Sequence, residues 1–128
     1  MRWLPLALIC VSLAACGDEA KSAGSGDVTK LTVRVDGDGS GPAKARTLEL
    51  SCAEGDTSGA CAAAAKLSAA DLKPTPANTA CTQIYGGPET ASIKGTLNGE
   101  QVDAKFSRTD GCEIKRWETV SPLLDEAR

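Results

Sequence analysis

Hydrophobic and polar residues alternate in four stretches of the chain, and a period of two predicts β-strands. The stretches are residues 28–35, 46–52, 91–97 and 100–108. Each has one apolar side, as expected for a sheet that covers a core with one face and meets water with the other. The expected inward residues are Leu31, Val33, Val35, Leu48, Leu50, Ala91, Ile93, Gly95, Leu97, Val102, Ala104 and Phe106.

Turn and helix signals separate these strands. Asn98-Gly99 predicts a type I′ hairpin between the last two strands, which makes that pair antiparallel. Residues 60–72 are rich in alanine and predict a helix, which Pro74 and Pro76 end. The expected inward residues of this helix are Ala64, Leu67 and Leu72.

The C-terminal part predicts a second, shorter helix. Apolar residues recur at helical spacing after the turn at residues 109–111, and residues 122–124 look like an extended apolar end. The recurring residues are Ile114, Trp117 and Val120. We expect Trp117 to cover the core rather than bind a ligand, because the chain has few aromatic residues. The elements together predict an α+β fold.

The N-terminus has the pattern of a bacterial lipoprotein signal. Arg2 precedes an apolar run, residues 4–15, that is too short to span a bilayer, and Leu13-Ala14-Ala15-Cys16 matches a lipobox. We expect a signal peptide at residues 1–15, a lipidated Cys16 and a flexible polar tether through residue 27, followed by one domain at residues 28–128. This predicts an exported protein anchored to the extracytoplasmic face of the cell membrane. An ordinary secretory signal is the alternative.

Composition argues against several classes of function. The chain has 128 residues, a net charge of −3 and no histidine. The charge gives no electrostatic reason to expect nucleic acid as a partner. Without histidine, the chain cannot form a Ser-His-Asp or Cys-His catalytic site or a zinc site that contains histidine. We therefore expect a protein that is not an enzyme and that uses no metal or cofactor.

Four cysteines remain after the two N-terminal ones, Cys10 in the leader and the lipidated Cys16, are set aside. An even number of cysteines in an exported protein predicts disulfide bonds. Three pairings are possible, and we favour the sequential one, Cys52–Cys61 and Cys81–Cys112. A zinc site made of four cysteines is the alternative, although the spacing lacks the short hooks of such sites.

A glycine-rich stretch at residues 36–41 has two interpretations. Asp36, Asp38, Ser40 and Gly41 match the first half of an EF-hand calcium loop. The second half does not match, because Thr47 stands where the bidentate glutamate is expected. A simple connection between strands is the preferred interpretation, and calcium binding is the alternative.

The stretch with the clearest functional character is residues 80–88, which begins Ala80-Cys81-Thr82-Gln83-Ile84-Tyr85 and closes on Gly86-Gly87-Pro88. A half-cystine can fix one end, and the proline limits the freedom of the other. Such a segment can be displayed as an extended peptide, which a protease cleft reads as an added strand. We therefore expect a serine protease to bind residues 80–86.

At these residues the chain resembles the subtilisin inhibitor-like family. The resemblance covers residues 28–124 and is most specific in Cys81-Thr82-x-x-Tyr85…Pro88, Gly95-x-Leu97-x-Gly99 and Phe106…Gly111-Cys112-Glu113. It implies a five-stranded antiparallel sheet with two short helices, the same two disulfides, frequent homodimers and reversible inhibition of subtilisin-type proteases. By position, the reactive bond is Gln83–Ile84.

The chain departs from the family pattern at two places. Residues 54–59 are shorter than the family's turn and lack its histidine and proline, and Gly86-Gly87 replaces a single aspartate before the proline. A tethered envelope protein that keeps the fold but binds something other than a protease therefore stays open as the alternative function.

Overall fold

The computed structural model describes residues 27–38 and 44–128. The expected signal peptide, the lipidated Cys16, tether residues 16–26 and the part of the calcium-loop match at residues 39–41 lie outside the described residues. Within the described ranges, no helix combines the length and the apolar character needed to cross a membrane.

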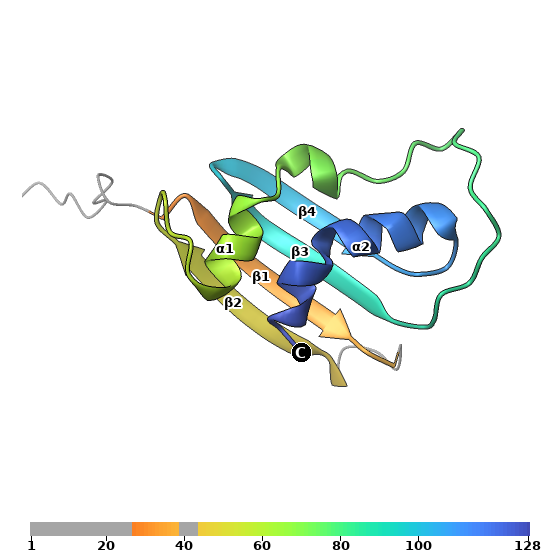
Figure 1. Cartoon of the computed structure of the whole chain (residues 1–128), viewed down its shortest axis with the longest axis horizontal. Helices are drawn as coiled ribbons and strands as arrows, with labels where there is room; N and C mark the ends of the chain where they lie inside the picture. Colours follow the sequence, from red (N-terminus) through yellow and green to blue (C-terminus); the bar gives the residue numbers. More distant parts are fainter. Residues whose placement is uncertain (1–26, 39–43) are drawn as a thin grey trace, which may run out of the picture.

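Four antiparallel strands form one sheet, in the order β2-β1-β3-β4 (Figure 1). They are β1 (Thr29–Asp36), β2 (Arg46–Cys52), β3 (Thr90–Leu97) and β4 (Glu100–Phe106). Val33, in the middle of β1, lies opposite Leu48 of β2 and Ile93 of β3. The predicted apolar sides of the strands therefore share one face of the sheet.

The sheet has four strands rather than about five, so the number implied by the family resemblance is wrong. The remaining chain between the helices and β3, residues 73–89, contains Pro74, Pro76 and Pro88 and forms no ladder with a strand. Proline has no N–H to donate, so a run interrupted by three prolines is a poor partner for continuous pairing.

The expected helix at residues 60–72 is divided into two shorter elements. Helix α1 (Gly59–Ala65) is followed by the 3₁₀ helix η3 (Ala69–Leu72). The division occurs at Ser68, whose backbone N–H and hydroxyl both donate to Asp71 Oδ2, at 2.8 and 2.9 Å. This capping box starts a new helical segment. The three predicted inward residues, Ala64, Leu67 and Leu72, are buried as expected.

The second helix is longer than predicted, and the extended end at residues 122–124 is wrong. Helix α2 (Gly111–Asp125) begins after Asp110, whose carboxylate accepts a hydrogen bond from Glu113 N at 2.9 Å. It continues through Pro122, although a proline inside a helix costs about 3 kcal/mol. Leu123 and Leu124 are fully buried, and burying a leucine contributes roughly 1.5–3 kcal/mol, which offsets that cost.

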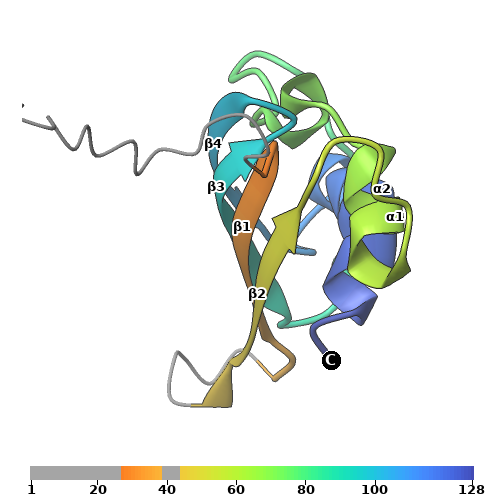
Figure 2. The same ribbon diagram turned by 90° about the vertical axis from the view of Figure 1, so that its left-hand side faces the viewer.

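All helices cover the same face of the sheet, so the domain has two layers (Figure 2). The core lies between the layers and combines the inward strand residues with α2. Trp117 is buried there, as predicted. The most deeply buried large side chains are Leu31, Val33, Ile93, Leu97, Val120, Leu123 and Leu124.

The predicted hairpin turn is present and has a second role. Asn98 and Gly99 both have positive φ, 49° and 87°, as a type I′ turn requires. The Asn98 side chain also donates to the carbonyl of Leu67 at 3.0 Å, which connects the hairpin to the chain between α1 and η3.

Candidate functional site

The segment singled out in the sequence, residues 80–88, connects η3 to β3 and runs around the N-terminal end of α2 (Figure 1). We call it the displayed segment. Ile84 and Tyr85 lie at its centre and are 59% and 65% exposed. They are the only large hydrophobic side chains that are exposed in the described part of the chain. Exposed apolar side chains that gather at one place indicate a binding surface.

Two backbone hydrogen bonds hold the displayed segment on either side of its centre. Gly111 N donates to the carbonyl of Thr82 at 3.0 Å, and Gly86 N donates to the carbonyl of Arg108 at 2.7 Å. Both partners belong to residues 105–116, the stretch from the end of β4 into α2, which we call the platform. The segment is therefore fixed at two points of one neighbouring element.

Between these two hydrogen bonds, the backbone N–H and C=O groups of the displayed segment have no hydrogen-bond partner in the described ranges. Gln83, Ile84 and Tyr85 form no backbone hydrogen bond with any residue in the described ranges, and neither does Cys81. The Gln83 side chain is exposed and also has no hydrogen-bond partner there. Free N–H and C=O groups in a fixed segment are the groups that a partner's cleft can pair with when it adds the segment as a strand.

A disulfide supports the N-terminal half of the displayed segment. Cys81 is bonded to Cys112 in the first turn of α2, with 5.4 Å between the Cα atoms. Thr82 continues this contact, because its side chain lies directly against Gly111. A Cβ added at Gly111 would collide with Thr82 Oγ1. The glycine thus allows the segment and the helix to approach closely.

Two glycines perform the corresponding role in the C-terminal half. A Cβ added at Gly86 would lie 3.0 Å from Ile114 Cδ1 and 3.3 Å from Arg108 Cβ. Gly87 has a φ of 138°, and a Cβ there would collide with the Glu89 carboxylate. Gly86 therefore lets the segment pack against the platform, and Gly87 lets the Glu89 carboxylate lie close to the backbone.

An ion pair fixes the residue that directly follows the segment, Glu89. Arg108 Nη1 lies 3.0 Å from Glu89 Oε1, and both side chains are less than one third exposed. Arg108 thus contacts the segment through its backbone carbonyl at Gly86 and through its guanidinium at Glu89.

A second arginine fixes the chain that leads into the displayed segment. Arg116 donates to the carbonyls of Leu72 and Lys73, at 3.1 and 2.9 Å, and to the carbonyl of Lys105 at 3.1 Å. Its guanidinium also pairs with Glu113 at 2.8 Å. Because η3, β4 and α2 meet at this one side chain, the chain that leads into the segment is fixed to the platform.

The other disulfide lies in the body of the domain. Cys52 at the end of β2 is bonded to Cys61 in α1, and both are buried. The turn between them contains Asp56. The Ser58 hydroxyl and the Ser58 backbone N–H both donate to its carboxylate. These hydrogen bonds, the one from the hydroxyl most of all, lower the pKa of Asp56 below its ordinary value.

Both pairings are the sequential ones that the sequence analysis favours. The alternative zinc site of four cysteines is wrong, because the four sulfurs are bonded to one another in pairs. Cys81, Cys112 and Asp110 form the one cluster in the described part of the chain with the spacing of metal ligands. Its two sulfurs form the disulfide, and Asp110 caps α2, so these atoms already have partners.

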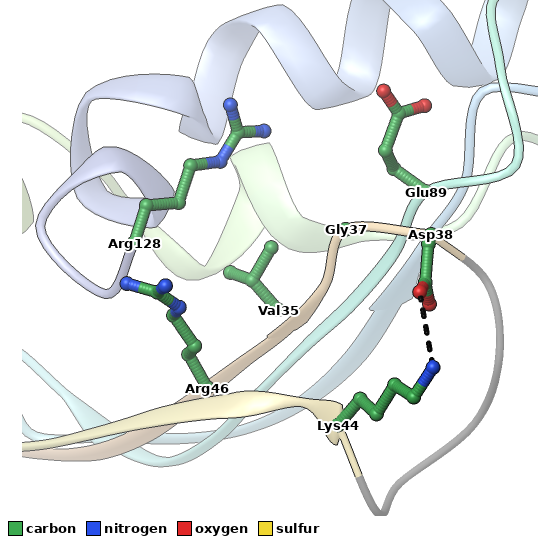
Figure 3. A pocket seen from close by; sticks show the side chains of 7 residues that line it. All are labelled: Val35, Gly37, Asp38, Lys44, Arg46, Glu89 and Arg128. Atoms are coloured by element: carbon green, nitrogen blue, oxygen red, sulfur yellow. Dashed lines mark ion pairs between the residues drawn. The ribbon is translucent and has the colours of Figure 1, made fainter.

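A shallow cleft of about 410 Å³ lies at one end of the sheet (Figure 3). Charges of both signs line it, and Lys44 pairs with Asp38 there at 3.9 Å. Glu89 also lines the cleft, but its carboxylate points away from Lys44, on the side facing α2. This mixture of charges of both signs specifies no ligand.

Comparison of the chain with models of known protein families, with curated protein sequences and with solved structures finds no significant match.

The structure thus brings the predicted segment and the second disulfide together, and it adds residues that sequence reasoning missed. Arg108, Glu89, Ile114 and Arg116 carry no motif. Glu89 and Arg108 lie in loops and Ile114 and Arg116 lie in α2, and only the tertiary fold brings them to the displayed segment or to the chain that leads into it. Gly111 is the exception, because it belongs to the stretch Phe106…Gly111-Cys112-Glu113 that carries the family resemblance.

Proposed function

We propose that this protein is a serine protease inhibitor of the subtilisin inhibitor-like type, with Gln83–Ile84 as its reactive bond. One observation carries the proposal. The backbone of Gln83, Ile84 and Tyr85 is exposed and unpaired, while Thr82 and Gly86 on either side are bonded to the platform. This arrangement suits a peptide that is already held in the shape a protease binds.

Tight binding follows because the segment is already held in one shape before the protease binds it. A flexible peptide loses conformational freedom when it enters a cleft, whereas a segment fixed by the disulfide and two backbone bonds has little left to lose. The enzyme pairs with the free backbone groups, and the exposed side chains of Ile84 and Tyr85 bury apolar surface against it.

Slow turnover follows from the same contacts. When a serine protease cuts the bond, Gln83 becomes an ester on the catalytic serine and Ile84 becomes the free amine. In an ordinary substrate the amine leaves. Here both new ends stay attached to one folded body, so the amine remains at a high effective concentration and re-forms the bond.

The side chain before the reactive bond indicates the class of protease. Gln83 is exposed and carries no charge. It cannot form an ion pair with an aspartate at the bottom of a trypsin-like pocket, whereas a broad subtilisin-like pocket accepts an uncharged side chain. The proposed partner is therefore a subtilisin-like serine protease.

The location and assembly of the protein are part of the same proposal. We propose that lipidated Cys16 anchors the domain to a bilayer on the extracytoplasmic side, or that the protein is secreted if the lipobox is not used. The resemblance also implies a homodimer through the sheet. The uncovered face of the sheet carries Glu49, Lys94 and Asp103, so a dimer there would have to pair these charges.

Inhibition kinetics test the proposal. The domain is mixed with subtilisin and a chromogenic peptide, and we expect activity to fall to zero at one equivalent of domain. Subtilisin whose catalytic serine is blocked by a sulfonyl group is the matched control, and it should not bind the domain. Full enzyme activity in the presence of excess domain would contradict the proposal.

A second candidate function is a tethered envelope protein that binds a partner other than a protease. The four-stranded sheet favours it, because the family resemblance implies five strands. No binding of the domain to subtilisin, and no effect on the active enzyme, would favour this candidate.

A further inference from the structure

The two sides of the Gln83–Ile84 bond are held by different kinds of contact. The Cys81–Cys112 disulfide and the bond from Gly111 to Thr82 secure the side that ends at Gln83. No disulfide secures the side that begins at Ile84. After a cut, this side is connected to the body only through the chain into β3 and through noncovalent contacts.

Arg108 supplies most of those noncovalent contacts. Its carbonyl accepts the hydrogen bond from Gly86 at 2.7 Å, and its Cβ lies beside the same glycine. Its guanidinium pairs with Glu89 at 3.0 Å, one residue before β3 begins. Ile114 adds an apolar contact to Gly86. The short stretch after Ile84 is thus held at both ends by one residue.

Glu89 depends on this pairing. Its Oε2 atom is buried and has no hydrogen-bond partner in the part of the chain that the structure describes. Only Oε1 is paired, and its partner is Arg108. A carboxylate that is partly removed from water is costly without its counter-charge, so loss of Arg108 would release Glu89 and, with it, the close contact at Gly87.

We propose that Arg108, through its ion pair with Glu89, is a positioning residue for re-formation of the cut bond. The inference rests on the proposed inhibitor function. In the acyl-enzyme, the amine nitrogen of Ile84 attacks the carbonyl carbon of Gln83. The new C–N bond forms, the ester bond to the serine oxygen breaks, and one amine proton passes to that oxygen. The pair keeps the Ile84 amine close enough for this attack.

Two features make the role separable from general stability. The Arg108→Ala variant loses the ion pair but keeps the backbone carbonyl that Gly86 bonds to. The disulfide and the platform contacts of Thr82 are also unchanged. The loss therefore falls on the side that begins at Ile84, and the equilibrium ratio of cut to intact domain should rise about three- to tenfold.

The test measures that ratio at fixed pH with a catalytic amount of subtilisin, approaching equilibrium from intact and from cut domain. Intact mass distinguishes the two forms by one water molecule. The variants are Arg108→Ala, Glu89→Gln and the conservative Arg108→Lys. Lys30→Ala is the matched control, because it removes one exposed positive charge at the opposite end of the sheet. Thermal unfolding of each variant is recorded in parallel.

We expect Arg108→Ala and Glu89→Gln to raise the ratio of cut to intact domain. Arg108→Lys, which keeps the positive charge, should raise the ratio less, and Lys30→Ala should leave it unchanged. A ratio in Arg108→Ala and Glu89→Gln equal to that of the wild type would overturn the inference. An equal rise in Lys30→Ala would overturn it too. If the wild-type domain neither inhibits subtilisin nor is nicked at Gln83–Ile84, the proposed function itself fails, which is a different result.

Discussion

The two disulfides hold regions of opposite character. Cys52–Cys61 lies in the core and connects the end of β2 to α1. Cys81–Cys112 lies at the surface and connects α2 to a segment whose central side chains face solvent. The first bond crosslinks elements that packing already brings together. The second fixes residues that bury little apolar surface of their own.

This difference shows that one part of the fold can supply the stability of the domain while another part holds an exposed segment in a fixed shape. Burial of the core stabilises the body, and the displayed segment contributes little to it. The order of the segment comes instead from one covalent bond, two backbone hydrogen bonds and the contacts of Arg108 and Arg116. The same type of crosslink should therefore have different consequences when it is removed from each region.

Removal of the surface disulfide should have the largest effect. The Cys81→Ala/Cys112→Ala variant should inhibit subtilisin about a thousandfold less well, because ordering Gln83, Ile84 and Tyr85 then costs on the order of 1–2 kcal/mol each. We expect it to become a slowly cleaved substrate. Inhibition constants and intact mass over time provide the measurement.

The matched variant is Cys52→Ala/Cys61→Ala. It should lose up to about 2.7 kcal/mol of unfolding free energy in the loop-entropy estimate. Below its melting temperature it should still inhibit. If the two double variants lose inhibition equally, the contrast between the two regions is wrong.

A charge introduced into the displayed segment should have the next largest effect. Gln83→Lys should gain about a hundredfold in affinity for trypsin, because a buried pair with the pocket aspartate contributes a few kcal/mol. Thr57→Lys places the same side chain at an exposed position in the turn of the other disulfide and should gain nothing. Trypsin inhibition assays measure the affinity of both variants. Equal inhibition constants for Gln83→Lys and Thr57→Lys would show that residue 83 does not enter the pocket.

A smaller effect is expected where the segment touches α2. Gly111→Ala should weaken inhibition by roughly tenfold, because the new Cβ meets Thr82 Oγ1 and forces that side chain to move. Adding Thr82→Ala removes this oxygen and should restore part of the inhibition. Inhibition constants of the two variants test the contact, and a constant in Gly111→Ala equal to that of the wild type would exclude it.

The smallest effect concerns the turn of the core disulfide. Hydrogen bonds from Ser58 lower the pKa of Asp56, so they contribute stability above the unfolded-state pKa of about 3.9. The contribution is lost as pH falls through the lower folded-state pKa. NMR titration should show the pKa of Asp56 rising towards its ordinary value in Ser58→Ala, and subtilisin inhibition should not change.

The sequence predicted the parts of the molecule that have a local pattern. Alternation located all four strands, Asn98-Gly99 located the hairpin, and the favoured cysteine pairing is the one present. The helices were predicted less well. Ser68 divides the first helix through a capping box, and the second continues through Pro122 because Leu123 and Leu124 are buried. In both cases local capping or tertiary burial outweighed propensity.

The supports of the displayed segment had no such pattern. Arg108 and Arg116 resemble any other surface arginine in the sequence. In the fold, Arg108 contacts Gly86 and Glu89, and Arg116 connects η3, β4 and α2. Their roles depend on contacts between residues far apart in the chain, and a single sequence does not encode such contacts in a readable period. The disulfide between the segment and the platform could be predicted, but the contacts of Arg108 and Arg116 could not.

The most direct measurement is the intact mass of the domain after incubation with an equimolar amount of subtilisin. The account predicts that enzyme activity is lost while the domain remains whole or carries one nick, between Gln83 and Ile84. Rapid digestion at many sites with the enzyme still active, or a stable nick elsewhere in the chain, would contradict it.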